Sequence, residues 1–463
     1  MLQSFGRRVR ELSIHVVADE IDPSVYILLV KALGENPLLP NIRNLTFVPW
    51  FKENVFHGAI LNLLFSPSLR KVYLAAAREI LQHHNYSTFA RRLVGAPGLN
   101  CLNLVGFSPC QKVLDGVLSL KNISEIELDF SDSPNVIANR TMLLLFGTLE
   151  CLSSLTITLP EVNRVPPCPT TNQTTVFSKL VDLELYCSFE DALQFWADAK
   201  LPSLQKLHYM FRIPDPPLIP TFRWKEFLDG LMIATTSQFT SLKLRSSAYP
   251  ILDWVESRRL WAMMETYPSV SFHSLAGTLL RLNLTCFEIS FPFFESLCAA
   301  DFAAMGAAWP NMTRLQLHTI SLQAPISDTS VLRIIATAFP RLVVLVIDMN
   351  AERIDKPSLV PFSHPLGLLV VRLVGCPQTV TAKLRFAALV DSLFPNLRTI
   401  TDPSFAHDHI YKQVDQIEEF LEELQSTRKR ERNRIRTEFH LPGIKQHNDD
   451  ANTYSDDEDD EDF

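Results

Sequence analysis

The sequence predicts an α/β horseshoe solenoid, in which parallel strands line the concave face and helices form the convex face. Three observations lead to this prediction. A six-residue apolar pattern recurs along most of the chain, proline precedes it in about half of its copies, and amphipathic helical segments lie between the copies. One strand and one helix cannot bury their apolar sides alone, whereas stacked units share a continuous core.

The recurring pattern is an apolar residue, two variable residues, a second apolar residue, one variable residue and a third apolar residue. Alternate side chains of a strand point to opposite faces, so the last two apolar residues face the core together. Val9 to Leu397 spans 388 residues and thirteen intervals, or about thirty residues per repeat. The fourteen copies begin at Val9, Ile42, Leu69, Leu99, Ile123, Leu152, Leu180, Leu204, Phe239, Leu279, Met312, Leu342, Leu368 and Leu397.

Proline directly before the pattern, as in LPNIRNL, WPNMTRL and FPNLRTI, favours a change from helix to strand. Proline cannot continue a helix, and it holds the preceding residue in an extended conformation. Between the copies, apolar residues recur at intervals of three and four, which predicts helices. These helices are expected at Pro23–Leu33, Glu190–Lys200, Trp224–Ala234, Ser330–Phe339 and Lys383–Phe394. The alternative, an ordinary α/β domain with chance matches, does not explain the near-regular spacing.

The chain resembles the irregular leucine-rich-repeat proteins of mushroom-forming fungi, many of which are F-box proteins. The resemblance covers roughly residues 5–435 and rests on FGRRVRELSI, PLLPNIRNLTF, the P-x-L-x-x-L-x-L series and the closing TRKRERNRIR. It implies a leucine-rich-repeat solenoid. It also implies an N-terminal F-box that binds the Skp adaptor of a cullin ubiquitin ligase, with the repeats holding the substrate.

Two features depart from that resemblance. Only eight residues precede Val9, and they contain no segment of the L-P-x-E type. We therefore expect the F-box to be absent from this sequence. A Skp-type adaptor is expected to bind only if an F-box lies upstream. The repeats also lack a regular Asn or Cys after the strand, which predicts irregular turns. The expected function is therefore non-catalytic protein binding, as the substrate-recognition part of an F-box-type ubiquitin ligase subunit. The alternative is a stand-alone scaffold or inhibitor solenoid unrelated to ubiquitin.

The end of the chain predicts two further segments after a solenoid at 1–409. Val414, Ile417, Leu421 and Leu424 follow a 3-4-3 spacing, which predicts a C-terminal capping helix at 410–437. Its basic end, 428–436, is typical of either a nuclear localisation signal or a solvated helix end.

Residues 438–463 are predicted to be a disordered acidic tail. Residues 437–463 hold ten acids and one base, a net charge of −9, whereas the whole chain has −8. Ser455 precedes Asp456, Asp457 and Glu458, which is a context for phosphorylation by acidophilic kinases. The tail is suited to solubility, to docking on a basic partner, or to folding back on residues 428–436.

Charge, hydropathy and cysteine spacing restrict the setting of the protein. Subtracting the −9 of residues 437–463 from −8 leaves about +1 for the rest, which favours neither nucleic acid nor a membrane as a partner. No secretory signal or long apolar run is visible, so we expect a cytoplasmic or nuclear protein that is not secreted. The eight cysteines form no C-x-x-C pair and are expected to be reduced and mostly buried.

Enzymatic motifs are missing from the sequence. We find no phosphate-binding glycine loop, no G-x-S-x-G and no H-E-x-x-H. His407, Asp408 and His409 are adjacent but follow the repeats, and alternate side chains diverge. Polar side chains facing solvent therefore explain them better than metal binding. We therefore predict no catalytic residue, no metal and no cofactor.

The concave face is the candidate partner-binding surface. The first row on this face consists of the residues between the last two apolar positions of each copy, and the second row consists of the residues that follow. The first row passes through Asn283 and the second through Thr285 in the tenth copy. The candidate residues, acidic in the middle repeats and basic later, are Glu127, Asp129, Glu184, Tyr186, His208, Lys243, Arg245, Gln316, His318, Asp348 and Arg372.

Overall fold

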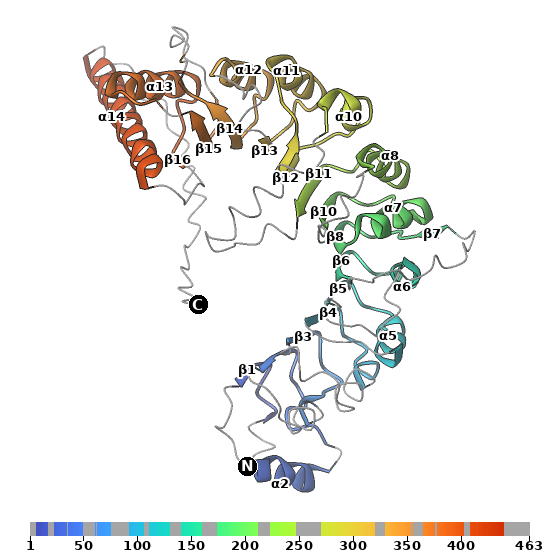
Figure 1. The fold of residues 1–463 in the computed structure, drawn as a ribbon. Helices are drawn as coiled ribbons and strands as arrows, with labels where there is room; N and C mark the ends of the chain where they lie inside the picture. The colour runs from blue at the N-terminus through green and yellow to red at the C-terminus, as the bar shows by residue number, and fades with distance from the viewer. Residues whose placement is uncertain are drawn as a thin grey trace.

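The computed structural model shows one curved array of strands and helices (Figure 1). It describes residues 6–438 except for 17–22, 35, 50–60, 62, 76–91, 106–110, 130–139, 160–173, 212–222, 247–269, 320–328, 353, 355–363, 376 and 402–407.

One parallel sheet of fourteen strands runs through the described residues in chain order. Each strand pairs with the strands of the preceding and following repeats, so repeats that are neighbours in sequence are also neighbours in space. The predicted fold class is confirmed. The strands are β1 (Glu11–Val16), β2 (Asn44–Pro49), β3 (Lys71–Ala75), β4 (Cys101–Val105), β5 (Glu125–Asp129), β6 (Ser154–Thr158), β8 (Asp182–Cys187), β10 (Lys206–Phe211), β11 (Ser241–Ser246), β12 (Cys286–Phe294), β13 (Arg314–Thr319), β14 (Val344–Asn350), β15 (Leu368–Gly375) and β16 (Thr399–Thr401).

Helices form the outer, convex side of the array (Figure 1). A second sheet of two short strands, β7 (Thr175–Val176) and β9 (Ala199–Lys200), lies beside them. The predicted helices at 23–33 and 224–234 have the predicted bounds. The helices are α2 (Pro23–Leu33), α5 (Gln111–Leu118), α6 (Arg140–Leu145), η1 (Phe146–Thr148), α7 (Phe189–Asp198), α8 (Trp224–Ala234), α10 (Phe272–Leu279), α11 (Ala299–Ala308), α12 (Ser330–Ala338), α13 (Val380–Leu393) and α14 (Asp408–Glu438).

The core lies between the sheet and the helices and extends from one end of the array to the other. From β2 onward, the apolar strand positions of the repeat pattern are buried, as at Leu183 and Leu185 of β8. The middle repeats add aromatic packing, where Trp224 contacts the rings of Phe211 and Phe293 edge to face. This continuous burial gives the sheet a fixed orientation, which decides which side chains reach the concave face.

For two copies of the pattern, the register predicted from the sequence is wrong. In the tenth, Leu279 ends α10, and the strand follows from Leu284 as LTCFEI, so that Phe287 pairs with Leu242. In the thirteenth, the pattern begins at Leu366, because Leu369 pairs with Leu345. Both segments contain two overlapping apolar patterns. In the tenth copy the pattern richer in leucine is not the strand, whereas in the thirteenth the two patterns contain equal numbers of leucines.

Backbone hydrogen bonds connect each repeat to the next at the start of the strand. The carbonyl of the residue after the first apolar position accepts two N–H groups from the following repeat; Asn100, for example, accepts from Ser124 and Glu125. In several repeats a hydroxyl at the same position donates to that carbonyl as well, as Ser124 Oγ does to Asn100 at 3.0 Å. This ladder begins at Arg10 and ends at the Gly367 carbonyl. It connects repeats of unequal length without the Asn ladder that the sequence lacks.

The last helix, α14, closes the array against α13 and β16 (Figure 1). Val414, Ile417 and Leu421 are buried, and Leu424 packs against the core, which is the stripe that the 3-4-3 spacing predicts. Arg428 forms an ion pair with Asp391 of α13. Beyond this contact, the helix is exposed from residue 429 to residue 438.

Candidate protein-binding surface

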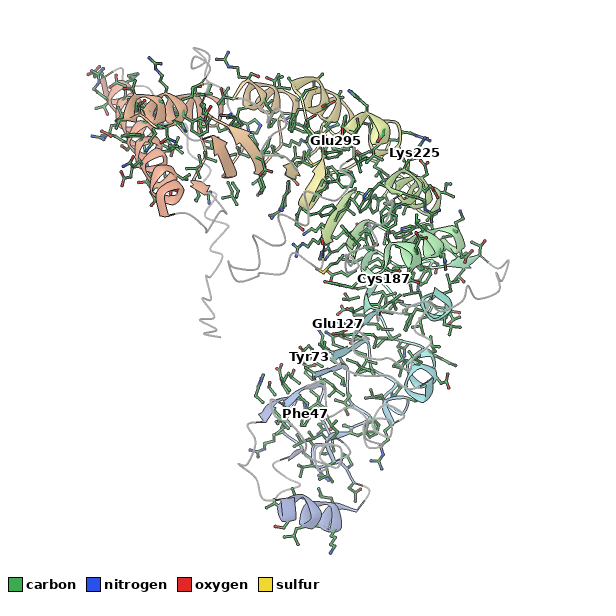
Figure 2. All side chains as sticks on the ribbon, viewed as in Figure 1. Phe47, Tyr73, Glu127, Cys187, Lys225 and Glu295 are labelled. Atoms are coloured by element: carbon green, nitrogen blue, oxygen red, sulfur yellow. The ribbon has the colours of Figure 1, made fainter. Side chains whose placement is uncertain are left out.

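The first-row side chains of β3 to β5 lie along the inner side of the arc, where Figure 2 shows Tyr73 and Glu127. Asn103 lies between them and donates from Nδ2 to Glu127 Oε2 at 2.7 Å. These three side chains are partly exposed, while their strand neighbours on the core side are buried. The alternation therefore presents a polar, half-buried surface to a partner.

Glu127 is a carboxylate under electrostatic repulsion. Burial raises its pKa, and the nearby charges of Glu184 and Asp129 raise it further. β6 separates the strands of Glu127 and Glu184, so their backbones are roughly 10 Å apart. A cation placed among these three carboxylates would relieve the repulsion.

Glu184, Tyr186 and His208 form a connected group on β8 and β10. His208 Nδ1 lies 3.2 Å from Glu184 Oε1, and the Tyr186 hydroxyl donates to Glu184 Oε2 at 3.3 Å. The hydrogen bond from His208 lowers the pKa of Glu184, so this carboxylate is ionised at neutral pH. Burial, reinforced by the Glu184 charge, raises the pKa of Tyr186 to about 12. Tyr186 therefore keeps its proton and remains a donor.

The basic candidates come next along the sheet, and they surround an acid that the sequence pattern missed. Lys243 of β11 lies 3.4 Å from Glu288 Oε1, and Arg314 Nε of β13 lies 2.6 Å from the same oxygen. Glu288 occupies the first-row position of β12, where the pattern placed Asn283, and its side chain is only 5% exposed. The wrong register predicted for the tenth copy displaced the first row by five residues, so the sequence pattern did not identify this carboxylate. Arg245, two residues after Lys243, is exposed.

We expect Glu288→Gln to destabilise the protein by about 1–3 kcal/mol, because two cations would then face a neutral amide. The loss is expected to shrink in high salt, since Lys243 and Arg314 are 37% and 43% exposed. Urea unfolding at low and high salt measures both effects. Asp182→Asn is the matched control, because Asp182 lies 3.6 Å from Lys206 on an open surface and should lose less than about 0.5 kcal/mol. Equal losses for the two variants would contradict the structural role of Glu288.

The remaining candidates lie at the C-terminal end of the sheet. Gln316 is a partly buried first-row residue of β13, whereas Asp348 of β14 is 1% exposed and offers little surface. Arg372 pairs in register with Asp348, so it belongs to the second row and Val370 takes its predicted first-row position. His318 lies on β13 in register with Pro292. The side chains of His318 and Arg372 lie outside the described residues.

The strands bring together only part of the candidate set. Glu127 to Arg245 lie on five adjacent strands, which span about 19 Å. Asp348 and Arg372 lie three and four strands beyond β11. The surface therefore consists of an acidic band over β5–β8, a neighbouring basic band over β10–β13, and a separate group at the end. Ser455, His407 and the acidic tail lie outside the described residues.

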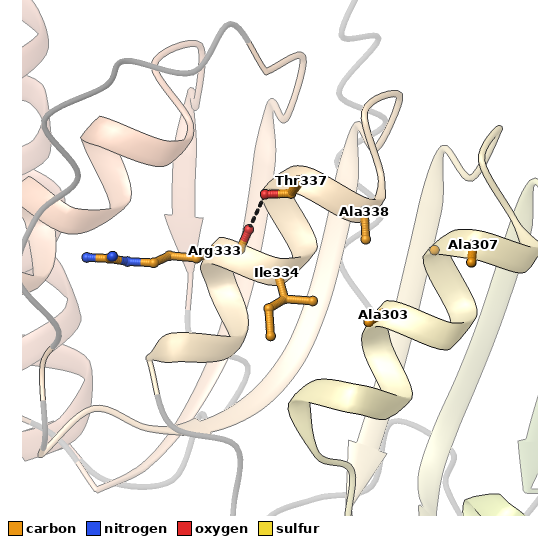
Figure 3. A pocket seen from close by; sticks show the side chains of 7 residues that line it. Ala303, Ala307, Arg333, Ile334, Thr337 and Ala338 are labelled. Carbon is orange, nitrogen blue, oxygen red and sulfur yellow. Dashed lines mark hydrogen bonds between the residues drawn. The ribbon is translucent and has the colours of Figure 1, made fainter.

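In the described part of the chain, no group of three or more His, Cys, Asp or Glu side chains is placed to hold a metal ion. No helix of that part is long and apolar enough to span a membrane. Fewer cysteines are buried than expected: among the described ones, Cys187 is buried, Cys298 is exposed, and Cys101, Cys151 and Cys286 are half-buried. A groove of about 490 Å³ lies between α11 and α12 on the convex side, where alanines and Ile334 make its lining apolar (Figure 3).

Comparison with protein families and with curated proteins yields no match. Among solved structures, the Rad7 and Elc1 complex of yeast is similar over 78% of this chain and 75% of that chain, with 14% identity and a TM-score of 0.41. An internalin of Listeria monocytogenes is similar over 75% of this chain and 82% of its own, with 10% identity and a TM-score of 0.35. A leucine-rich-repeat protein of Leptospira interrogans covers 80% of this chain and 98% of its own, with 13% identity and a TM-score of 0.26. All three TM-scores lie below 0.5. The fourteen parallel strands in chain order, each formed by a copy of the leucine-rich pattern, make the described chain an α/β leucine-rich-repeat solenoid.

Proposed function

We propose that the concave face between β3 and β11 binds a protein partner and that the chain carries out no chemistry of its own. The observation that carries the proposal is the continuous first row of half-buried polar and aromatic side chains, exemplified by Tyr73, Glu127 and His208. A curved sheet places such residues on a rigid support, so binding does not require them to be ordered first. Aromatic residues that are already partly buried are common anchors of protein interfaces.

The charges of this face indicate which partner residues would fit. The charges of Glu184 and Asp129 repel that of Glu127, so a partner with lysine or arginine opposite β5–β8 would gain from occupying the acidic band. Lys243 and Arg314 are already paired with Glu288 and therefore offer less. The expected partner presents a basic segment to the middle of the solenoid.

The specific form of this function comes from the resemblance of the sequence to F-box-type proteins. We propose that the bound protein is the substrate of a ubiquitin ligase, with the solenoid as the recognition part. A scaffold or inhibitor unrelated to ubiquitin uses the same surface. A pull-down of the protein from its native cell with a Skp-type adaptor separates these two forms. Any upstream F-box is then retained, and only the first form includes the adaptor.

Charge reversal on the acidic band tests the binding surface. The full chain and its Glu127→Lys/Glu184→Lys variant are used to purify bound proteins from the cells that produce it. We expect the variant to lose a bound protein at least about tenfold, since like charges would then face the basic segment of the partner. Glu150→Lys/Glu419→Lys is the control, because both residues are exposed away from the concave face and the net charge change is the same.

Binding to the purified partner then measures the same effect directly. Thermal unfolding of both variants shows whether the fold is intact. Retention of every bound protein by the folded Glu127→Lys/Glu184→Lys variant contradicts the proposal, and equal loss in the control points to net charge instead of this surface.

A further inference from the structure

The exposed end of α14 carries cations in two different situations. Arg428 is paired with Asp391 of α13, and Arg434 is paired with Glu431 at 2.6 Å and with Glu438 at 2.7 Å. Lys429, Arg432 and Arg436 are exposed, and within the described part of the chain they contact no carboxylate. The helix therefore neutralises Arg428 and Arg434 internally. It leaves these three without a carboxylate partner, and also Arg430, which instead donates to the carbonyl and the hydroxyl of Ser426.

Lys429, Arg432 and Arg436 form one continuous stripe, which we call the basic stripe. Positions 429, 432 and 436 are separated by three and four residues, so they lie within an arc of roughly 60° on the helix surface. The stripe is about 10 Å long at 1.5 Å per residue. Arg434 lies on a different side of the helix, with its two carboxylate partners.

We propose that residues 449–462 of the same chain dock on the basic stripe. This segment contains nine acids, and it follows the end of α14 after the ten residues 439–448. Ten residues can extend over about 33 Å, whereas the far end of the stripe lies only about 14 Å from residue 438. The segment therefore reaches every cation of the stripe, and its connection to the helix holds it at an effective concentration in the millimolar range.

Single exposed ion pairs are weak, so docking depends on several pairs forming together. The consequence is that the stripe is shielded from acidic molecules in solution. Phosphorylation of Ser455 would add a charge of about −1.5 to −2 to the segment and strengthen its docking. This docking involves only the end of the chain and is independent of the concave face.

Carbodiimide cross-linking of the full chain tests this docking, because it joins lysine amines to carboxylates in direct contact. Equal mixing of unlabelled and ¹⁵N-labelled chains separates links within one chain from links between chains. We expect Lys429 to couple to residues 449–462 of the same chain at least about fivefold more than exposed Lys225 of α8 does. Salt of about 0.5 M should reduce the coupling, since the Debye length then falls below 8 Å.

Two double variants decide whether the stripe is responsible. Arg432→Gln/Arg436→Gln should reduce the Lys429 coupling to the level of Lys225. Arg281→Gln/Arg341→Gln removes the same charge from exposed positions elsewhere and should leave the coupling unchanged. Lys429 coupling no higher than that of Lys225, coupling only between chains, or equal effects of the two variants would overturn the proposal.

Discussion

A chain carrying Leu183→Asp is expected to lose the folded structure of its middle repeats. Leu183 is 0% exposed in β8, in register with the buried Leu155 of β6 and Leu207 of β10. A carboxylate at this position has no partner, and burying it costs several kcal/mol or more. This cost is comparable with the whole stability of a typical domain. Leu315→Asp in β13 replaces an equally buried leucine and should act in the same way.

Hydrogen exchange and thermal unfolding measure this loss. We expect faster exchange first in β6, β8 and β10, because each repeat contacts only its neighbours. Gln205→Asp introduces the same charge at an exposed position before β10 and should change the stability by about 0.5 kcal/mol or less. Unchanged melting of the Leu183→Asp variant would mean that β8 presents the opposite face to the core.

Trp309→Ala is expected to cost about 3–5 kcal/mol, the range for removing a large aromatic side chain from a core. Trp309 follows α11 and is 0% exposed, with its ring 5.4 Å from that of Phe287. Its Nε1 donates to the carbonyl of Leu282 at 2.8 Å. The alanine variant therefore leaves both a cavity and an unpaired buried carbonyl.

Trp309→Phe separates these two contributions. Phenylalanine keeps most of the apolar volume but cannot donate to Leu282, so we expect a smaller loss of about 1–2 kcal/mol. Urea unfolding of the three proteins gives the difference. If Trp309→Ala and Trp309→Phe lower the free energy of unfolding by amounts within about 0.5 kcal/mol of each other, the whole effect belongs to the hydrogen bond. If Trp309→Ala lowers it by nothing, the packing of the ring is contradicted.

The fold could be predicted from the sequence because burial alone produces the apolar spacing. The register was ambiguous where a segment contains enough apolar residues to match the pattern in two positions. Both Leu279 and Leu284 begin a possible pattern, and apolar spacing cannot choose between them. A second signal was available, since Thr285 follows Leu284 just as Ser124 follows Ile123, and both hydroxyls donate to the preceding repeat. Spacing combined with that hydroxyl position predicts the strand correctly.

The candidate surface was harder to predict than the fold. Alternation correctly placed Glu127, Glu184 and His208 on the concave face, because their strands have unambiguous registers. Alternation does not indicate how deeply a concave residue is buried. Asp348 is covered and Glu288 is enclosed by two cations, and neither property is visible in a periodic pattern. Such properties depend on which strands are adjacent.

The backbone ladder at the start of the strands has an evolutionary consequence. The bonds that connect repeats use one carbonyl and two N–H groups, which every residue except proline supplies. Their formation therefore requires no particular side chain, and the hydroxyls only reinforce them. Single repeats can lengthen, shorten or exchange nearly all of their residues while the connection to their neighbours is kept. Divergence in such a chain should erase sequence identity long before it alters the curvature of the array.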